Sequence, residues 1–380
     1  MTAAQMIPAP DTIRNDRLYI ALELSNKKWK IALGNGFKIR LKSIDAGDLN
    51  QFEMELQKSR RHFGMAEDVP AYCCYEAGRD GFWIHRYLCT LGIGNLVVDS
   101  SSIEVSRRSR RAKTDRLDAS KLVTMLIRYI NGETKLWSVL RVPGKEDEDA
   151  RRLHRETGRL KKERTAHTNR IKSLLALHGI KMEIRASFLR DIETAASWNG
   201  ELLPSRIKEE MIREYRRYDL IQQQLQALEQ EKKEVLKAGG KSPERVSKLQ
   251  NLKGIGPVGG WVLEYEFFGW RVFKKTKEVG AAAGLAPTPY DSGDSQSEQG
   301  ISKSGNRRVR ALMIEVAWYW LFHQPRSKLS QWFMERYGKG SKRMRRIGIV
   351  ALARKLLIAL WKYLEQGIIP EGAVLKAYHC

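Results

Sequence analysis

Three strand-like segments at the start of the chain, followed by alternating helices and strands, restrict this region to a mixed α/β fold. Alternating or continuous apolar runs predict strands at residues 18–24, 29–33, 37–41, 71–75 and 95–98, and helical periodicity predicts helices at 49–63 and 81–91. This β-β-β-α-β-α-β order is typical of an RNase H-like domain, although many α/β folds share its later half.

The remainder of the chain is predicted to be largely helical. A helix is expected over residues 115–130, with a stop at Asn131-Gly132, and the acidic run at 146–149 after Val142-Pro143-Gly144 is interpreted as a linker. Charged helical segments between 151 and 236, broken at 198–204, predict an antiparallel hairpin or a coiled coil. Two amphipathic helices packed on their own domains explain the same pattern equally well.

A helical C-terminal domain, interrupted by a polar loop over residues 288–305, is expected after Gly239-Gly240. We therefore predict an α/β domain at 1–145, a helical region for linkage or dimerisation at 146–238, and a helical domain at 239–380. A homodimer or a higher homo-oligomer would follow from a dimerising coiled coil.

The charge balance points to a polyanionic partner. Lysine and arginine number 68 against 44 acidic residues, which gives a formal net charge of +24. Because 42% of residues are hydrophobic, this charge belongs to a folded protein, and nucleic acid is the favoured partner. A membrane is disfavoured since the apolar stretches 311–322 and 347–361 are short and contain charges, and we predict that these stretches are buried helices. The start of the chain lacks a secretory pattern, so we expect a cytoplasmic, nucleoid-associated protein.

Four carboxylates suit a site for divalent cations. Glu23 and Glu76 lie at predicted strand ends, and Asp115 and Asp118 lie three residues apart on one helix face. Such oxygen ligands suit a two-Mg²⁺ site, which would stabilise both the attacking and the leaving oxygen of a phosphodiester. The alternative is that they are surface and helix-start acids, and spacing alone favours it.

Several basic and glycine-rich segments are predicted to contact nucleic acid. The residues in this group are Arg107, Arg108, Arg110, Arg111, Lys113, Gly254, Gly256, Lys303, Arg307, Arg308, Arg310, Lys342, Arg343, Arg345 and Arg346. Gly254 and Gly256 predict a tight turn between two helices whose backbone N–H groups face a phosphate, with a purely structural turn as the alternative. The aromatic residues at 318–320 are expected in the core and not as base-stacking platforms.

Six motifs in order resemble one family of insertion-sequence transposases, related to the pilin-gene inverting recombinases. They are Ala21-Leu22-Glu23, Tyr75-Glu76-Ala77, Lys113-Thr114-Asp115-Arg116-Leu117-Asp118, Lys253-Gly254-Ile255-Gly256, Ala283-Gly284-Leu285-Ala286-Pro287 and Ser292-Gly293, with Ser302-Lys303-Ser304-Gly305-Asn306 and Arg310 beyond. The resemblance implies a RuvC-like N-terminal domain in which Glu23, Glu76, Asp115 and Asp118 form the DEDD motif. It also implies a catalytic serine at Ser292 and an element-encoded guide RNA. Glu23 departs from the aspartate usual in the family.

These observations together predict a DNA transposase or site-specific recombinase. Ser292 would attack a phosphodiester, and the resulting phosphoserine link would conserve the bond energy for rejoining. Two alternatives remain at this stage. One is a RuvC-like nuclease that hydrolyses DNA with water, and the other is a nucleic-acid-binding protein with vestigial carboxylates.

Overall fold

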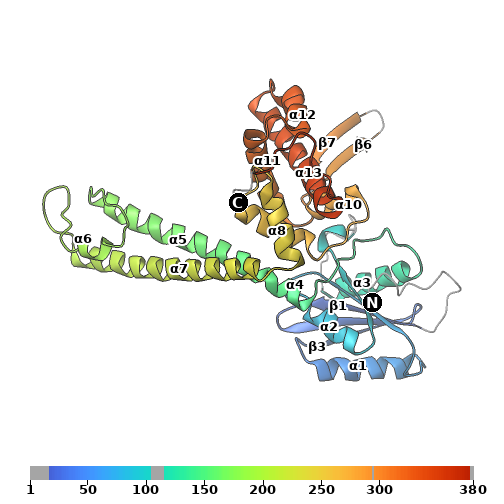
Figure 1. The fold of residues 1–380 in the computed structure, drawn as a ribbon. Coiled ribbons are helices and arrows are strands. Elements are labelled where there is room, and N and C mark those ends of the chain that lie inside the picture. The colour runs from blue at the N-terminus through green and yellow to red at the C-terminus, as the bar shows by residue number, and fades with distance from the viewer. Residues whose placement is uncertain (1–16, 104–114, 293–294, 377–380) are drawn as a thin grey trace. The chain divides into compact units, whose positions relative to one another are not determined.

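The computed structural model describes residues 17–103, 115–292 and 295–376 (Figure 1). The chain forms two compact units, one within Met1–Val142 and the other within Pro143–Cys380. Each unit has its own hydrophobic cores.

A five-stranded mixed sheet forms the centre of the first unit. Its strands are β1 (Leu18–Leu24), β2 (Lys28–Gly34), β3 (Ile39–Asp45), β4 (Ala71–Glu76) and β5 (Gly94–Val98), in the order β3-β2-β1-β4-β5. Neighbours β1, β2 and β3 pair antiparallel, whereas β4 is parallel to both β1 and β5. The predicted α/β class of this region is therefore confirmed.

The third strand begins later than the sequence pattern predicted. The side chain of Asn35 accepts hydrogen bonds from the backbone N–H groups of Phe37 and Lys38, at 3.0 and 2.8 Å. This turn occupies the residues expected to open the strand, and Phe37 is 67% exposed. The strand then continues to Asp45, beyond the predicted end at residue 41.

Helices cover both faces of the sheet. On one face, α1 (Leu49–His62) and α2 (Trp83–Thr90) bury Phe52, Ile84 and Leu88 against Ile20 and Leu22 of β1. On the other face, α3 (Asp115–Ile130) buries Ala119, Leu122 and Leu126 in a cluster with Tyr19, Ala21 and Cys74. The α3 helix has the bounds predicted from the sequence, while α2 is shorter than expected.

The division between the two units falls at the start of the predicted linker, between Val142 and Pro143, but the acidic run that follows is the helix α4 (Lys145–Ala150). Glu146, Asp147 and Glu148 occupy its first turn, where negative charge stabilises the exposed N–H groups of a helix. The Asp147 carboxylate also accepts a hydrogen bond from the Gly144 N–H at 3.3 Å. The acidic run is therefore a helix start.

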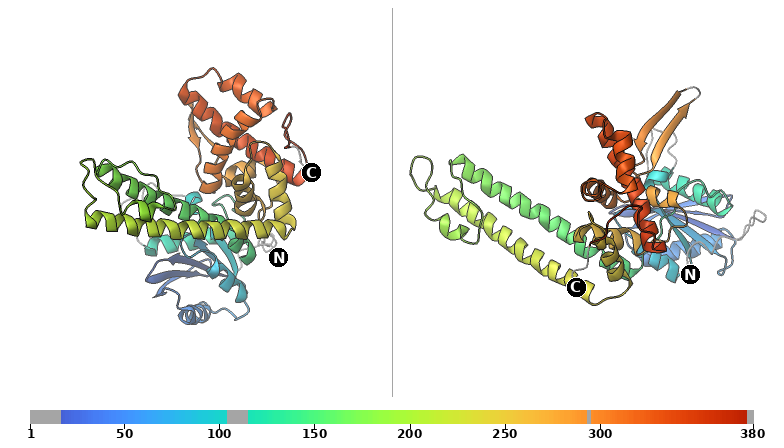
Figure 2. Two further views of the ribbon diagram at one scale, coloured as in Figure 1. Left: turned by 60° about the vertical axis from the view of Figure 1, so that its left-hand side comes forward. Right: turned by 45° about the horizontal axis from the view of Figure 1, so that its top comes forward.

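Two long helices follow as an antiparallel hairpin, α5 (Arg152–Leu177) and α7 (Ser205–Lys237), which lie side by side in Figure 1 and in Figure 2. The break begins at residue 178, earlier than predicted, and includes α6 (Phe188–Asp191). Phe188 stacks on Tyr215 of α7 with ring centroids 4.9 Å apart. His167, which interrupts the apolar heptad positions of α5, lies 2.5 Å from a carboxylate oxygen of Glu214 on α7.

The C-terminal part of the second unit is helical, as predicted. Its elements are α8 (Lys241–Asn251), α9 (Pro257–Leu263), the π-helix η4 (Glu264–Phe268), α10 (Thr276–Ala282), α11 (Arg307–His323), α12 (Lys328–Tyr337) and α13 (Lys342–Gln366). They share one core, in which Trp320 and Phe333 are fully buried. No helix in the described ranges has the length and apolarity needed to cross a membrane.

Two expectations for this part are wrong. The polar segment 288–305 contains the two antiparallel strands β6 (Pro287–Ser292) and β7 (Ser295–Ile301), because backbone pairing forms a hairpin without an apolar face. The aromatic residues of α11 also differ, since only Trp320 is core. Trp318, Tyr319 and Phe322 are 41%, 60% and 78% exposed.

Candidate active site

Two of the four predicted carboxylates end neighbouring parallel strands. The register of β1 with β4 runs through Leu22 and Tyr75, and Glu23 and Glu76 are the next residues along these strands. Both side chains are partly buried. Carboxyl ends of parallel strands meet at one edge of a sheet, so the fold places these two residues next to each other there.

Strand alternation puts both carboxylates on the face that α3 covers. Tyr19 and Ala21 of β1 and Cys74 of β4 contribute to the cluster with α3. Glu23 and Glu76 are each two residues further along and therefore lie on the same face. Burial raises the pKa of the Cys74 thiol, and the charge of Glu76 raises it further, as expected for a carboxylate beside this cluster.

The direction of α3 brings its first turn toward this edge. Val123 lies opposite Gly34, which pairs with Tyr19 at the beginning of β1. The Cys74 thiol donates to the carbonyl of Leu122 at 3.7 Å. Cys74 pairs with Ala21, which is two residues beyond Tyr19 on β1. Earlier residues of α3 therefore lie nearer the carboxyl ends of β1 and β4. Asp118 precedes Leu122 by about one turn, so we infer that the first turn of α3 lies near the carboxylate edge.

Of the other two predicted metal ligands, Asp115 and Asp118, the structure describes the side chain of Asp118 alone. Asp118 is partly buried in the first turn of α3, while Asp115 begins that helix and its side chain is outside the described residues. Among the side chains that are described, no three His, Cys, Asp or Glu residues lie close enough together to hold a metal ion. The basic run Arg107, Arg108, Arg110, Arg111 and Lys113 also lies outside the described ranges.

In the second unit, Ser292 is the last residue of β6 and pairs with Ser295 of β7. Its side chain is not among those described. The base of this hairpin is fixed by backbone hydrogen bonds, from Ser302 N–H to Ala286 O at 2.9 Å and from Asn306 N–H to Ala282 O at 2.8 Å. The hairpin is thereby attached directly to the end of α10 and the start of α11.

Basic side chains surround the base of the hairpin. Lys303, Arg307 and Arg308 are exposed, and Lys303 has a φ of +56°, which is unusual for a residue with a side chain. Arg310 is partly committed to structure, because its guanidinium donates to Ala283 O at 3.1 Å. Its pKa is lowered by burial and then by the nearby charge of Arg307.

A buried carboxylate that the sequence reasoning missed links the helical hairpin to this region. Glu266 of η4 is 1% exposed and accepts two hydrogen bonds from Arg155 of α5, at 2.6 and 3.2 Å. His154 Nε2 lies 3.2 Å from it, and the Asn306 amide donates to it at 3.3 Å. Burial raises the pKa of Glu266, but the His154 and Arg155 side chains outweigh burial and lower it to about 2.

Asn306 contacts both parts of this region. Its side-chain oxygen caps α11 by accepting from the N–H groups of Arg308 and Val309, while its amide nitrogen donates to Glu266. The position of the α11 start therefore depends on Glu266, and through it on α5. A glutamate inside the run Glu264-Tyr265-Glu266-Phe267-Phe268 is the sequence signal that marked a buried ion pair.

The predicted glycine turn connects the helices α8 and α9. Gly254 has a φ of +92°, and a Cβ atom there would lie 3.3 Å from the carbonyl oxygen of Tyr319. Gly256 precedes Pro257, the first residue of α9. The turn predicted from the sequence is confirmed, whereas contact with a phosphate stays a prediction.

The second predicted basic cluster opens α13. Lys342, Arg343, Arg345 and Arg346 are exposed in its first two turns, and the first turn contains no acid. Positive charge at the start of a helix is electrostatically unfavourable by itself. A bound polyanion would remove this penalty.

Known proteins similar to this chain identify the family. The Transposase IS116/IS110/IS902 family matches residues 246–331. A protein of Sinorhizobium fredii named "Putative transposase y4rJ" is 41% identical, and the alignment covers 99% of this chain and 100% of that protein. The chain belongs to the IS116/IS110/IS902 family of transposases.

More distant relatives agree. The transposase for insertion sequence element IS1328 of Yersinia enterocolitica is 25% identical over 60% of this chain and 66% of its own length. The transposase for insertion sequence element IS1111A of Coxiella burnetii is 27% identical, covering 74% of this chain and 75% of that protein. The matched family region of this transposase contains the glycine turn, Ser292 and Arg310.

Proposed function

We propose that this transposase cuts and rejoins DNA in a Mg²⁺-dependent reaction that passes through a covalent link between Ser292 and DNA. The observation that carries the proposal is the carboxylate edge of the first unit. Glu23 and Glu76 end neighbouring parallel strands on the face covered by α3, whose first turn carries Asp118. The sheet order β3-β2-β1-β4-β5 supports an RNase H-like, RuvC-like domain.

The carboxylates fit hard cations by their chemistry. Glu23, Glu76, Asp115 and Asp118 would hold the Mg²⁺ ions, since carboxylate oxygens are the protein ligands such cations prefer. When bound, Mg²⁺ would neutralise negative charge at the reacting phosphate. Glu23 extends one methylene further than the aspartate usual in the family, so Glu23→Asp should retain activity.

In the proposed covalent step, Ser292 Oγ forms a bond to the phosphorus and the bond to one deoxyribose oxygen breaks. The hydroxyl proton of Ser292 passes to a base, and the departing oxygen takes up a proton, so the overall step is neutral. Exposed Lys303, Arg307 and Arg308 at the hairpin base would stabilise charge on the phosphate. Attack by a DNA hydroxyl on the phosphoserine reverses the step and joins strands without ATP.

Nucleic-acid partners follow from the family and the charge. The net charge of +24, and the unbalanced first turn of α13, support binding of DNA and of a guide RNA. A homodimer or a larger homo-oligomer is also part of the proposal, although α5 and α7 pair with each other within one chain and do not by themselves require a second copy.

A metal-dependent nuclease without a covalent intermediate is the second candidate. It is favoured by one observation, that all four carboxylates belong to the first unit while Ser292 belongs to the second. In this alternative, water replaces Ser292 as the nucleophile, and the second unit only binds.

Cleavage of a labelled duplex that contains the ends of the element, with Mg²⁺ or with EDTA, tests the proposal. Asp118→Ala should abolish cleavage but leave binding of the duplex intact, because the basic surface is unchanged. Asp45→Ala is the matched control, as Asp45 is an exposed acid of the same unit that pairs with Lys28, at 2.7 Å. Cleavage that continues in EDTA, or in Asp118→Ala, would contradict the metal assignment.

A further inference from the structure

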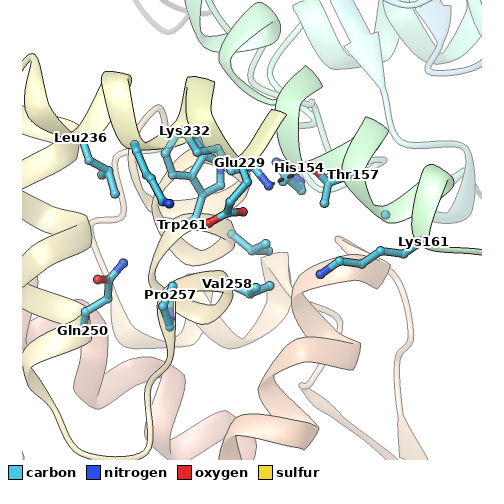
Figure 3. Close-up of a pocket in the computed structure, with 13 residues that line it drawn as sticks. His154, Thr157, Lys161, Glu229, Lys232, Leu236, Gln250, Pro257, Val258 and Trp261 are labelled. Atoms are coloured by element: carbon cyan, nitrogen blue, oxygen red, sulfur yellow. Dashed lines mark hydrogen bonds between the residues drawn. The ribbon is translucent and has the colours of Figure 1, made fainter. Parts of the chain in front are cut away.

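A cavity of about 160 Å³ lies in the second unit where the base of the helical hairpin meets α8 and α9 (Figure 3). Side chains from α5, α7, α8 and α9 line it. None of the predicted catalytic or basic residues belongs to this lining. His154, described above beside Glu266, belongs both to the lining and to the candidate site region.

One wall of the cavity is apolar and includes an indole ring. Trp261, Val258 and Pro257 of α9 contribute to this wall. Trp261 is only 4% exposed, and its indole N–H has no hydrogen-bond partner among the described residues. Because the indole nitrogen is itself buried, this wall offers a ligand apolar contact and not that donor.

Polar groups converge on the same space from the helical hairpin. In Figure 3, the side chains of Lys232, Glu229 and Lys161 extend toward the space above Pro257 and Val258. Lys232 Nζ donates to the Thr157 hydroxyl at 2.8 Å, and within the described part of the chain no carboxylate lies within ion-pair distance of it. Its partial burial lowers its pKa.

The charge of the lining favours an anionic group at the rim. Lys161, Lys232 and Lys233 outnumber Glu229, the single acid of the lining. Lys161 and Lys233 are exposed, so they lie where a ligand would enter. Glu229, which is also exposed, and the partly buried amide of Gln250 add hydrogen-bond acceptors to the lining.

One residue of the lining is a glycine. Gly158 lines the cavity from within the 26-residue helix α5, and an added Cβ atom would meet no other atom within 4 Å. Glycine within a helix costs about 1 kcal/mol relative to alanine. A larger side chain at this position would therefore extend into open space beside the cavity without colliding with a neighbour.

We propose that this cavity binds one unstacked nucleobase of a nucleic-acid strand, with the adjoining phosphate at Lys161 and Lys233. The inference rests on the proposed function only in taking nucleic acid as the partner. A flat heteroaromatic ring suits an apolar wall that contains an indole, as in other pockets for extruded bases. Glu229 accepts N–H donors, so bases with an exocyclic amino group bind more tightly than uracil or thymine.

Ligand-observed saturation-transfer NMR on the full chain tests this, with AMP, GMP, CMP, UMP, their deoxy forms and ribose 5-phosphate as probes. Stacking of one base plus one phosphate contact predicts dissociation constants on the order of 1 mM. Saturation should reach the base protons more strongly than the sugar protons, and UMP should bind least. Comparison of the ribo and deoxy forms distinguishes RNA from DNA as the source of the base.

Variants assign the binding to this cavity. Gly158→Leu fills the space and should weaken AMP, GMP and CMP binding at least tenfold, whereas Ala166→Leu, at an exposed position of the same helix, should not. Lys161→Gln should weaken binding severalfold, and Lys162→Gln, an exposed neighbour outside the lining, should leave it unchanged. Thermal unfolding of each variant verifies that the fold is retained.

The opposite results are equally clear. Equal binding of ribose 5-phosphate would reduce the cavity to an anion site, and both this result and unchanged binding in Gly158→Leu and Lys161→Gln would overturn the inference. Absence of nucleotide binding by wild-type protein at several times the expected dissociation constant would do the same. Asp118→Ala should still bind nucleotides, so failure of the catalytic proposal and failure of this inference are distinguishable.

Discussion

The carboxylate edge and the serine hairpin represent two different ways of presenting a reactive group. Glu23 and Glu76 follow fully buried stretches of two central strands, and α3 begins just before the fully buried Ala119. Ser292 ends a strand of a two-stranded hairpin that, among the residues the structure describes, is a sheet of its own and is fixed at its base by backbone hydrogen bonds. The first group is positioned by core packing, and the second by a short attachment to α10 and α11.

The difference teaches where each site is vulnerable. Around the carboxylates, chemistry and packing are separable, since a carboxylate can be replaced while the buried strands remain intact. At the hairpin, the attachment depends on close backbone approach at Gly284 and Gly305 and on Asn306, which also contacts Glu266. Mutations outside the reactive serine should therefore matter more in the second unit.

The largest effect is expected for Glu76→Gln. The substitution keeps size and removes the charge, so it should lower the rate of DNA cleavage by roughly a thousandfold or more while changing stability little. Quantified cleavage of the labelled duplex, beside a melting curve, gives both values. A rate within about tenfold of wild type would show that this strand end is structural.

Loss of the Glu266 charge should destabilise the second unit. Because the pKa of Glu266 is lowered to about 2 in the folded chain, its ion pair stabilises the fold fully above the ordinary glutamate range, and this contribution is lost as pH falls toward 2. A shift of this size corresponds to about 3 kcal/mol. Urea unfolding should show Glu266→Gln less stable than wild type at pH 6, with the gap narrowing at pH 3. A gap that does not depend on pH would exclude the ion pair as its cause.

Alteration of the hairpin base should have an intermediate effect. Gly305 has a φ of +117°, and a Cβ atom there would collide with the carbonyl of Ala282. We expect Gly305→Ala to cost about 1–3 kcal/mol and to reduce joining together with stability. Gly300→Ala is the control, since Gly300 also has a positive φ, of +87°, but an added Cβ meets nothing within 4 Å. If Gly305→Ala and Gly300→Ala lowered the unfolding temperature equally, the backbone strain of a positive φ would explain the loss of stability without the collision with Ala282.

The smallest effect on stability is expected for removal of positive charge from the first turn of α13. This change should stabilise the fold but weaken DNA binding. Lys342→Gln and Arg343→Gln remove positive charge from a helix start, so each should stabilise the fold by about 0.3–1 kcal/mol at low salt. DNA affinity should nevertheless fall, and the slope of its salt dependence should decrease by about 1 for each phosphate that is no longer neutralised. Arg336→Gln, in the last turn of α12, should instead destabilise. Unchanged affinity would remove α13 from the nucleic-acid surface.

Much of the first unit could be predicted from the sequence because its signals are local. Alternation and burial predict β1, β4 and α3, and these elements alone carry Glu23, Glu76 and Asp118 to their positions. The local sequence pattern did not predict structure that depends on backbone pairing between strands or on ion pairs between residues distant in the sequence. The β6–β7 hairpin has no apolar face, and the Arg155–Glu266 pair joins residues 111 positions apart. Tyr319 and Phe322 look like core residues in sequence but occupy the exposed side of α11.

The most direct test of the proposed two-part catalyst is covalent capture of DNA. Wild-type protein with Mg²⁺ and a nicked suicide substrate should give a protein–DNA adduct on a denaturing gel, and mass spectrometry should map it to Ser292. The adduct should be absent from Ser292→Ala and from Glu76→Gln, but present in Ser295→Ala and Ser297→Ala. Ser292→Ala should change stability by no more than about 0.5 kcal/mol. Normal cleavage by Ser292→Ala without any adduct, or an adduct on another residue, would contradict the account.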